Sequence, residues 1–284
     1  MRTLGPVELA KLKSLSLPLR RVVAEGRASG RHRSRWRGPS HEFAQHRPYA
    51  PGDELKALDW KVYARQDRFY VREYQAEQSL NAMVLLDASG SMGFGAKWDA
   101  ARGLAMALSY LVLAEGDEAG LTLFDTAARA TVPARSSFAQ LEVLDEAVSA
   151  AKPGGETALH DVLEKAAARL RRRSLVIVVS DLLGDADKIL SVARALKARR
   201  HELLVLQVLD PAELSFPYEG QIVFDGLEGG ELFCDAAALG ALYRAEMQRR
   251  LRLYEATFHR SDVVYGLFTT DRPWVETLAR LLTR

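Results

Sequence analysis

The stretch SLVIVVSD, Ser174–Asp181, decides the fold, because it is apolar on both faces and ends in turn residues. A strand that buries both of its faces lies inside a parallel sheet with helices on either side. Two similar runs flank it along the chain, AMVLLD (Ala82–Asp87) and ELLVLQVLD (Glu202–Asp210). These three runs predict the central strands of a mainly parallel sheet.

Segments of helical length and periodicity alternate with these strands. Helices are expected at Lys97–Glu115, Phe138–Ala151, Ala158–Arg171, Lys188–Arg200, Ala236–His259 and from Pro273 onward. Further strands are expected at Ala119–Asp125, Ala128–Ala134 and Asp262–Thr269, with a hairpin over Gln221–Asp235 that turns at Gly229–Gly230. Alternation at this spacing is typical of the α/β class, so we expect a doubly wound sheet with helices on both faces.

Oxygen-bearing side chains follow the predicted strands. In the loop DASGSMG, Asp87 ends a strand and Ser89 and Ser91 come two and four residues later. Thr157 precedes a helix in GGETAL, and Asp181 ends the strongest strand. The carboxyl ends of parallel strands share one edge of the sheet, where ligands bind. Hard oxygens without nitrogen or sulfur favour Mg²⁺, Mn²⁺ or Ca²⁺. The competing interpretation is that Asp87, Ser89 and Ser91 only satisfy the loop and cap the following helix.

These five residues resemble the metal-ion-dependent adhesion site of the von Willebrand factor A fold. That site is D-x-S-x-S in a first loop, a threonine in a second and an aspartate in a third, which Asp87, Ser89, Ser91, Thr157 and Asp181 match in order. The resemblance implies that the first four hold a cation directly and that Asp181 acts through a water molecule.

An upstream segment carries a second resemblance. Residues 41–65, HEFAQHRPYAPGDELKALDWKVYAR, followed by DxSxSM, are similar to the bacterial family called domain of unknown function 58. Leu58 stands where that family usually has isoleucine. The resemblance covers about residues 38–284 and implies association with MoxR-type AAA+ ATPases.

The same segment contains alternating charges and aromatic rings, of which we single out Arg47, Asp53, Asp59, Trp60 and Arg65. One interpretation is an internally paired network that fixes an irregular module. Buried pairs of this kind specify geometry more than they add stability. The other interpretation is a surface that binds a partner.

The charge of the chain is asymmetric. Residues 1–40 hold ten Lys/Arg and two Glu, a net charge of +8. Because the whole chain carries +2, the remaining residues carry −6. The Arg27–Arg37 cluster, rich in Gly and Ser, reads either as a solvated arm or as a site for phosphates of nucleic acid or anionic lipid.

Several classes of protein are excluded or disfavoured. A single cysteine, Cys234, excludes an intrachain disulfide and a cysteine-cluster metal site. The longest uncharged apolar run, Gly103–Ala114, has twelve residues and is too short to span a bilayer. There is no P-loop and no nucleophile elbow. Serine at position 89 removes the second aspartate that a haloacid-dehalogenase-like phosphatase needs.

The sequence therefore predicts a cytoplasmic, non-enzymatic adaptor or scaffold with three parts. These are a basic arm or helix (1–37), a family-specific module packed on the main domain (38–79) and a von Willebrand A-like domain (80–284). The domain would present Mg²⁺, or Mn²⁺ or Ca²⁺, to a carboxylate of a protein partner, and the resemblance names a MoxR-type ATPase as that partner. The alternatives are a binder of nucleic acid or an anionic surface through residues 27–37, and a metal-dependent hydrolase that lacks an evident base.

Overall fold

The computed structural model describes residues 3–13, 37–50, 53, 58–75, 80–170, 173–225 and 231–283. They form two compact units, of which the larger contains residues 3–13 and 80–283 and the smaller residues 37–75, each within these described ranges. No helix in these ranges combines the length and the apolar character that crossing a membrane requires. The cluster Arg27–Arg37 lies outside the described residues except for Arg37, which begins a strand.

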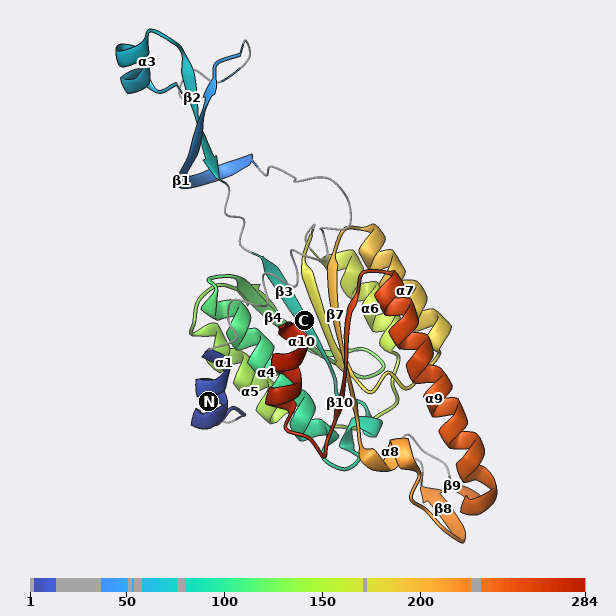
Figure 1. The fold of residues 1–284 in the computed structure, drawn as a ribbon. Helices are drawn as coiled ribbons and strands as arrows, with labels where there is room; N and C mark the ends of the chain where they lie inside the picture. Colours follow the sequence, from blue (N-terminus) through green and yellow to red (C-terminus); the bar gives the residue numbers. More distant parts are fainter. Residues whose placement is uncertain are drawn as a thin grey trace. The chain divides into compact units, whose positions relative to one another are not determined.

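The larger unit is built on a six-stranded sheet (Figure 1). Its strand order is β10 (Val264–Thr269), β7 (Glu202–Leu209), β6 (Leu175–Ser180), β3 (Asn81–Asp87), β4 (Glu118–Phe124) and β5 (Ala128–Arg135). Neighbouring strands are parallel except for β5, which pairs antiparallel with β4. The predicted doubly wound, mainly parallel sheet is confirmed.

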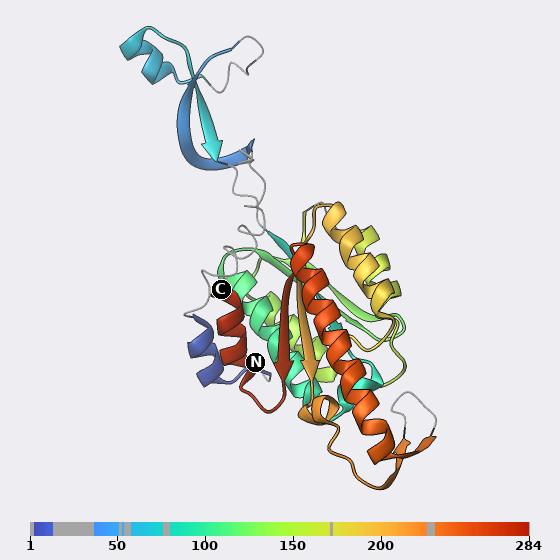
Figure 2. The same ribbon diagram turned by 45° about the vertical axis from the view of Figure 1, so that its right-hand side comes forward.

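Helices cover both faces of this sheet, as Figure 2 shows from a second direction. One face packs against α1 (Pro6–Lys13), α4 (Lys97–Ala114), α5 (Gln140–Ala150) and α10 (Trp274–Leu282). The other packs against α6 (Leu159–Arg169), α7 (Ala186–Ala198) and α9 (Ala236–Arg260). Two apolar cores therefore hold the sheet between them.

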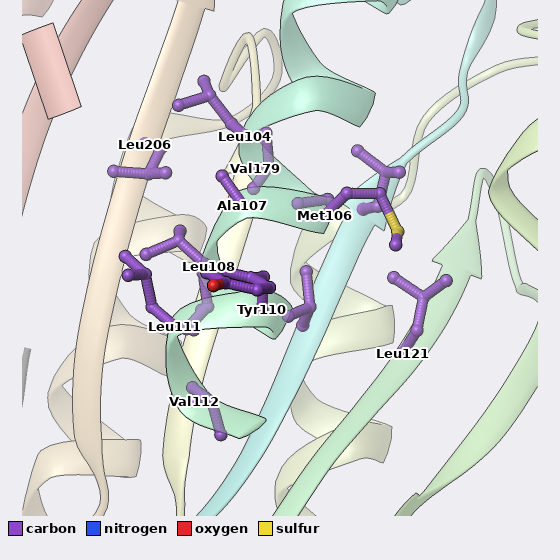
Figure 3. Close-up of a cluster of buried hydrophobic side chains, with 14 of the residues drawn as sticks. Leu104, Met106, Ala107, Leu108, Tyr110, Leu111, Val112, Leu121, Val179 and Leu206 are labelled. Carbon is purple, nitrogen blue, oxygen red and sulfur yellow. The ribbon is translucent and has the colours of Figure 1, made fainter. Parts of the chain in front are cut away.

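Helix α4 is the centre of the first core. Its residues from Leu104 to Leu113 are nearly all buried, and Figure 3 shows them against Leu121, Val179 and Leu206 of three strands. A helix that is apolar on most of its surface is stable only where neighbours surround it. Here the sheet, α1, α5 and α10 do so, which fixes the first residue of α4 at the carboxyl edge of the sheet.

The N-terminal helix α1 belongs to the larger unit. Leu4 and Leu12 are buried in the first core, and the amide of Thr3 donates to Asp145 Oδ1 at 3.0 Å. The part of residues 1–37 that is described as helix is thus a component of the main domain. The packing of residues 38–79 on that domain stays a prediction.

Two elements complete the larger unit beyond the sheet. A short helix, α8 (Pro211–Ser215), follows β7 directly, and β8 (Gln221–Asp225) pairs antiparallel with β9 (Glu231–Asp235). The hairpin is confirmed, whereas its predicted turn at Gly229–Gly230 lies outside the described residues. The sequence interpretation did not include α8.

The smaller unit is a twisted antiparallel pair, β1 (Arg37–Pro48) and β2 (Tyr70–Gln75), with the helix α3 (Trp60–Gln66) between them in sequence. The carboxylate of Asp59 caps α3 by accepting from the amides of Lys61 and Val62. The rings of Tyr63 and Phe69 stack with centroids 4.4 Å apart. The predicted module of irregular and β structure therefore contains an antiparallel strand pair whose register shifts at two places in β1.

Candidate metal site at the carboxyl edge of the sheet

Three loops lie at one edge of the larger sheet, at the end where β7 leads into α8 (Figure 1). Strand β3 ends at Asp87, and β6 ends one residue before Asp181. Both aspartate residues are fully buried. Because β3 and β6 are adjacent and parallel, the two carboxylates follow neighbouring strands, and their charges interact.

Within the described part of the chain, the donors that Asp87 accepts hydrogen bonds from are neutral. The amide of Ser89 donates to Oδ1 at 2.9 Å, and the hydroxyl of Ser180 donates to Oδ2 at 2.6 Å. Burial, followed by the charge of Asp181, raises the pKa of Asp87 to about 6 although these hydrogen bonds lower it. A buried carboxylate of this kind is costly to keep charged without a cation.

Ser89 and Ser91 bring their hydroxyls together. Both residues are buried, and their Oγ atoms are 3.2 Å apart. Ser89 precedes the 3₁₀ turn η2 (Gly90–Gly93) but its side chain makes no capping hydrogen bond, and the residue that precedes α4 is Ala96. Neither serine side chain is thus seen to cap a helix. The amide of Ser89 does satisfy Asp87 within the loop, so the interpretation that these residues serve only the loop stays a prediction.

Thr157 lies in a loop that is hydrogen-bonded to the DASGSMG loop. The amide of Gly90 donates to Gly155 O at 2.8 Å, and the amide of Gly154 donates to Ala88 O at 2.9 Å. Arg129 holds the other side of this loop by donating to Gly154 O and Lys152 O. Among the described residues, Thr157 Oγ1 is the buried side-chain oxygen without a hydrogen-bond partner.

Asp181 has a different environment from Asp87. Its Oδ2 accepts from the ammonium group of Lys97 at 2.8 Å, and its Oδ1 accepts from the amide of Leu183 at 3.1 Å. The same ammonium group donates to Glu213 Oε1 at 2.7 Å. Asp181 is thus paired with a buried cation of the chain itself.

Sequence reasoning missed three members of this cluster, Lys97, Ser180 and Glu213. A signal existed for Lys97: it is the first residue of a largely apolar helix, where the helix dipole disfavours a positive charge. A signal also existed for Glu213, the fourth residue of the capping box Asp210–Glu213. Neither signal shows that Lys97 and Glu213 pair with each other or that Lys97 pairs with Asp181.

The residues present fit a hard divalent cation. No group of three or more His, Cys, Asp and Glu that could hold a metal was found among the described residues, so the donor set rests on hydroxyls and one carboxylate. A buried carboxylate with neutral donors and a buried hydroxyl without a partner both lack what a cation would supply. Oxygen donors of these types suit Mg²⁺ and Mn²⁺.

Two of the residues singled out in the smaller unit, Asp53 and Asp59, have hydrogen-bond partners within that unit. Asp59 Oδ2 lies 3.0 Å from His46 Nε2, and the amide of Ala50 donates to Asp53 Oδ2 at 2.9 Å. Trp60 is 59% exposed and Arg65 is exposed. Arg47 pairs through its backbone position with Val71, and its side chain lies outside the description. The network that joins these residues stays a prediction.

Comparison with proteins of known sequence and structure gives relatives over most of the chain. Uncharacterized proteins of Mycobacterium tuberculosis and Mycobacterium bovis are 29% identical over 294 residues, which covers 98% of this chain and 89% of theirs. The uncharacterized protein YeaD of Bacillus subtilis is 40% identical over 48 residues, 17% of this chain and 12% of YeaD.

Two solved structures are similar at low identity. The conserved hypothetical protein BatB of Bacteroides thetaiotaomicron has 17% identity and a TM-score of 0.46, with 72% of this chain and 98% of BatB covered. The SpRpn10 VWA domain has 10% identity and a TM-score of 0.39, with 71% and 94% covered. The family model described as "Protein of unknown function DUF58" matches residues 45–253, and the chain belongs to that family.

Proposed function

We propose that the larger unit is a non-enzymatic, cation-dependent protein-binding domain. Asp87, Ser89, Ser91 and Thr157 hold Mg²⁺, or Mn²⁺ or Ca²⁺ in its place, and Asp181 acts through a water molecule. The cation leaves one position for a carboxylate of a partner protein. The bound cation supplies a positive charge that an acidic side chain can reach, and its effect is strongest when water is excluded.

The observation that supports this proposal best is the orphaned hydroxyl of Thr157. Its Oγ1 is buried and has no hydrogen-bond partner among the residues that the structure describes, and two backbone hydrogen bonds attach its loop to the Ser89–Ser91 loop. Burying a hydroxyl without a partner costs about 1–3 kcal/mol. A bound cation would remove this cost, and it would also neutralise the Asp87 carboxylate.

The chain's own residues define what the site offers. The hydrogen bonds from Ser89 and Ser180 fix the plane of the Asp87 carboxylate, and the attached loops keep the hydroxyls in place before a partner arrives. Among the described residues, no histidine forms a hydrogen bond or ion pair with these five side chains, and the proposal assigns no base that would activate a water molecule. An arrangement of this kind favours binding over hydrolysis.

The partner that the family resemblance suggests is a MoxR-type AAA+ ATPase. We propose that such an ATPase presents an aspartate or glutamate to the cation site. The cytoplasmic location predicted from the sequence belongs to the same proposal, since an ATPase partner needs cytoplasmic ATP.

The direct test measures Mn²⁺ binding and partner binding together. The purified full chain is titrated with Mn²⁺, and its co-expressed MoxR-type ATPase is captured with and without EDTA. We expect Asp87→Ala to weaken Mn²⁺ by at least about 100-fold, since even residues behind metal ligands change affinity 10–100-fold, and to abolish capture. The control is Asp161→Ala, which removes a half-exposed carboxylate on α6.

Each outcome of this test separates the proposal from its rivals. Capture that survives EDTA and Asp87→Ala but falls steeply with salt would favour phosphate or acidic-surface binding by residues 27–37. Mn²⁺-dependent turnover of a generic phosphoester would favour a hydrolase. Unchanged Mn²⁺ affinity in Asp87→Ala would overturn the cation site itself.

A further inference from the structure

Lys97 is a fully buried lysine with two carboxylate partners. Its side chain is 0% exposed, and its Nζ lies 2.8 Å from Asp181 Oδ2 and 2.7 Å from Glu213 Oε1. Burial of an ammonium group costs several kcal/mol before pairing, and apolar residues of similar volume are often at least as stable. Stability alone is therefore a weak reason for a lysine at this position.

Hydrogen bonds at the beginning of α8 fix the position of Glu213, one of the two carboxylate partners of Lys97. The amide of Asp210 donates to Glu213 Oε2 at 2.8 Å within the capping box of α8, and Thr270 Oγ1 donates to Asp210 Oδ2 at 2.8 Å. Glu213 is thus fixed by the backbone and is a rigid partner for Lys97. The position of the ammonium group follows from α8 as much as from α4.

Gly95 allows the loop before α4 to lie close to Asp210 at the beginning of α8. It has a φ of +57°, and a Cβ atom there would lie 2.3 Å from Asp210 Oδ2. Any other residue at this position would displace either the loop before α4 or the beginning of α8. The close approach of Gly95 to Asp210 sets where α4 begins, and so which carboxylates its first residue, Lys97, can reach.

The charges of the cluster add up to a value that suits a divalent ion. Asp87, Asp181 and Glu213 are three carboxylates and Lys97 is one ammonium group, which leaves two negative charges. Lys97 contacts Asp181 and Glu213, whereas Asp87 has neutral donors. One of the two remaining negative charges therefore lies on Asp87, and the other is shared by Asp181 and Glu213 around Lys97.

We propose that Lys97 is a positioning residue of the cation site, which holds Asp181 as its own counter-ion and keeps that carboxylate from ligating the cation directly. This inference rests on the proposed function. Asp87 then remains the one charged ligand, and Asp181 accepts from a cation-bound water. The chain lowers its own affinity for the cation in this way, and leaves room in the coordination shell for the carboxylate of a partner.

The test compares three variants by Mn²⁺ titration of the full chain, with thermal unfolding in EDTA as the check of folding. Lys97→Met releases Asp181 and adds one net negative charge, so Mn²⁺ should bind more tightly. Glu213→Gln leaves Lys97 to Asp181 alone and removes one negative charge, so Mn²⁺ should bind more weakly. A merely structural role of Lys97 would weaken binding in both variants.

The double variant Lys97→Met/Glu213→Gln gives the decisive comparison, because its net charge equals that of the wild type. If Lys97 restrains Asp181, the double variant binds Mn²⁺ about tenfold more tightly than the wild type. Removing residues behind metal ligands usually lowers metal affinity by about 10–100-fold, so a gain would be specific to a residue that restrains a ligand. Equal or weaker binding overturns the positioning role. The double variant also lacks the unpaired Glu213 carboxylate that is expected to destabilise Lys97→Met.

The outcomes separate this inference from the proposed function. A wild type that binds Mn²⁺, with variants that fail to shift as expected, overturns the role of Lys97 and leaves the cation site standing. A wild type that binds no Mn²⁺ overturns both. If neither variant with methionine folds, tighter or unchanged Mn²⁺ binding by Glu213→Gln still overturns the proposal. Weaker binding supports it when thermal unfolding in EDTA is unchanged, and overturns it when stability falls as well, because a structural role of Lys97 would lower both.

Discussion

The loops that follow β3 and β6 begin alike and differ in their electrostatics. Each has an aspartate at the end of a buried strand, Asp87 and Asp181, and both are fully buried. Asp87 accepts from an amide and a hydroxyl, whereas Asp181 accepts from the ammonium group of Lys97. The same sequence signal, an aspartate after an apolar strand, thus gives two different carboxylates. Asp181 is paired with the ammonium group of Lys97, whereas Asp87 has no such cationic partner in the described structure. The role of a buried carboxylate is decided by its donors.

The largest expected difference between the two loops is in the free energy of unfolding measured without metal, when each aspartate is replaced by asparagine. Asp181→Asn removes a charged partner of Lys97, and we expect the free energy of unfolding to fall by about 2 kcal/mol, as for other hydrogen bonds to charged groups. Asp87→Asn removes a buried charge with neutral donors, and we expect no loss or a small gain. Urea unfolding in EDTA measures both. Equal losses in the two variants would contradict the comparison.

The second effect concerns pH. Burial and the charge of Asp181 raise the pKa of Asp87 to about 6. Because a proton and the cation compete for this carboxylate, Mn²⁺ affinity should fall as the pH falls through 6, by about tenfold between pH 7 and pH 5. An aspartate with an ordinary pKa would leave Mn²⁺ titrations unchanged over this range, so a flat profile would contradict the burial argument.

The same shift predicts the sign of the stability change without metal. The folded state binds more protons at Asp87 than the unfolded state between its ordinary pKa of 3.8 and about 6. The contribution of Asp87 to stability is therefore largest below that window and is lost as the pH rises through it. Asp87→Asn should remove this part of the pH dependence, which unfolding in EDTA at several pH values would show.

The smallest effect belongs to Thr157. Thr157→Val keeps the shape of the side chain and removes the buried hydroxyl that has no partner. We expect the free energy of unfolding in EDTA to rise by about 1 kcal/mol, while Mn²⁺ affinity falls. Thr157→Ser, which keeps the hydroxyl, is the control. A loss of stability in Thr157→Val would mean that the hydroxyl has a structural partner rather than a place at the cation site.

Much of the larger unit could be predicted because its signals are local. The apolar runs that become β3, β6 and β7 are continuous, and the helices between them have helical length and period. Elements with mixed patterns were harder: β1 contains two prolines among charged and aromatic residues, and α8 has five residues. In these elements local chemistry competes with the periodicity on which such predictions depend.

The sequence by itself determined the fold class and the order of Asp87, Ser89, Ser91, Thr157 and Asp181 after suitable strands and loops. Only the tertiary structure decided that Lys97 bonds Glu213, which is 116 residues away, and that Ser180 bonds Asp87 across 93 residues. Periodicity and turn chemistry act between near neighbours in the chain, whereas these pairs depend on the register of parallel strands and on the packing of α4 against them. The electrostatic difference between the two aspartates therefore becomes visible only in the folded molecule.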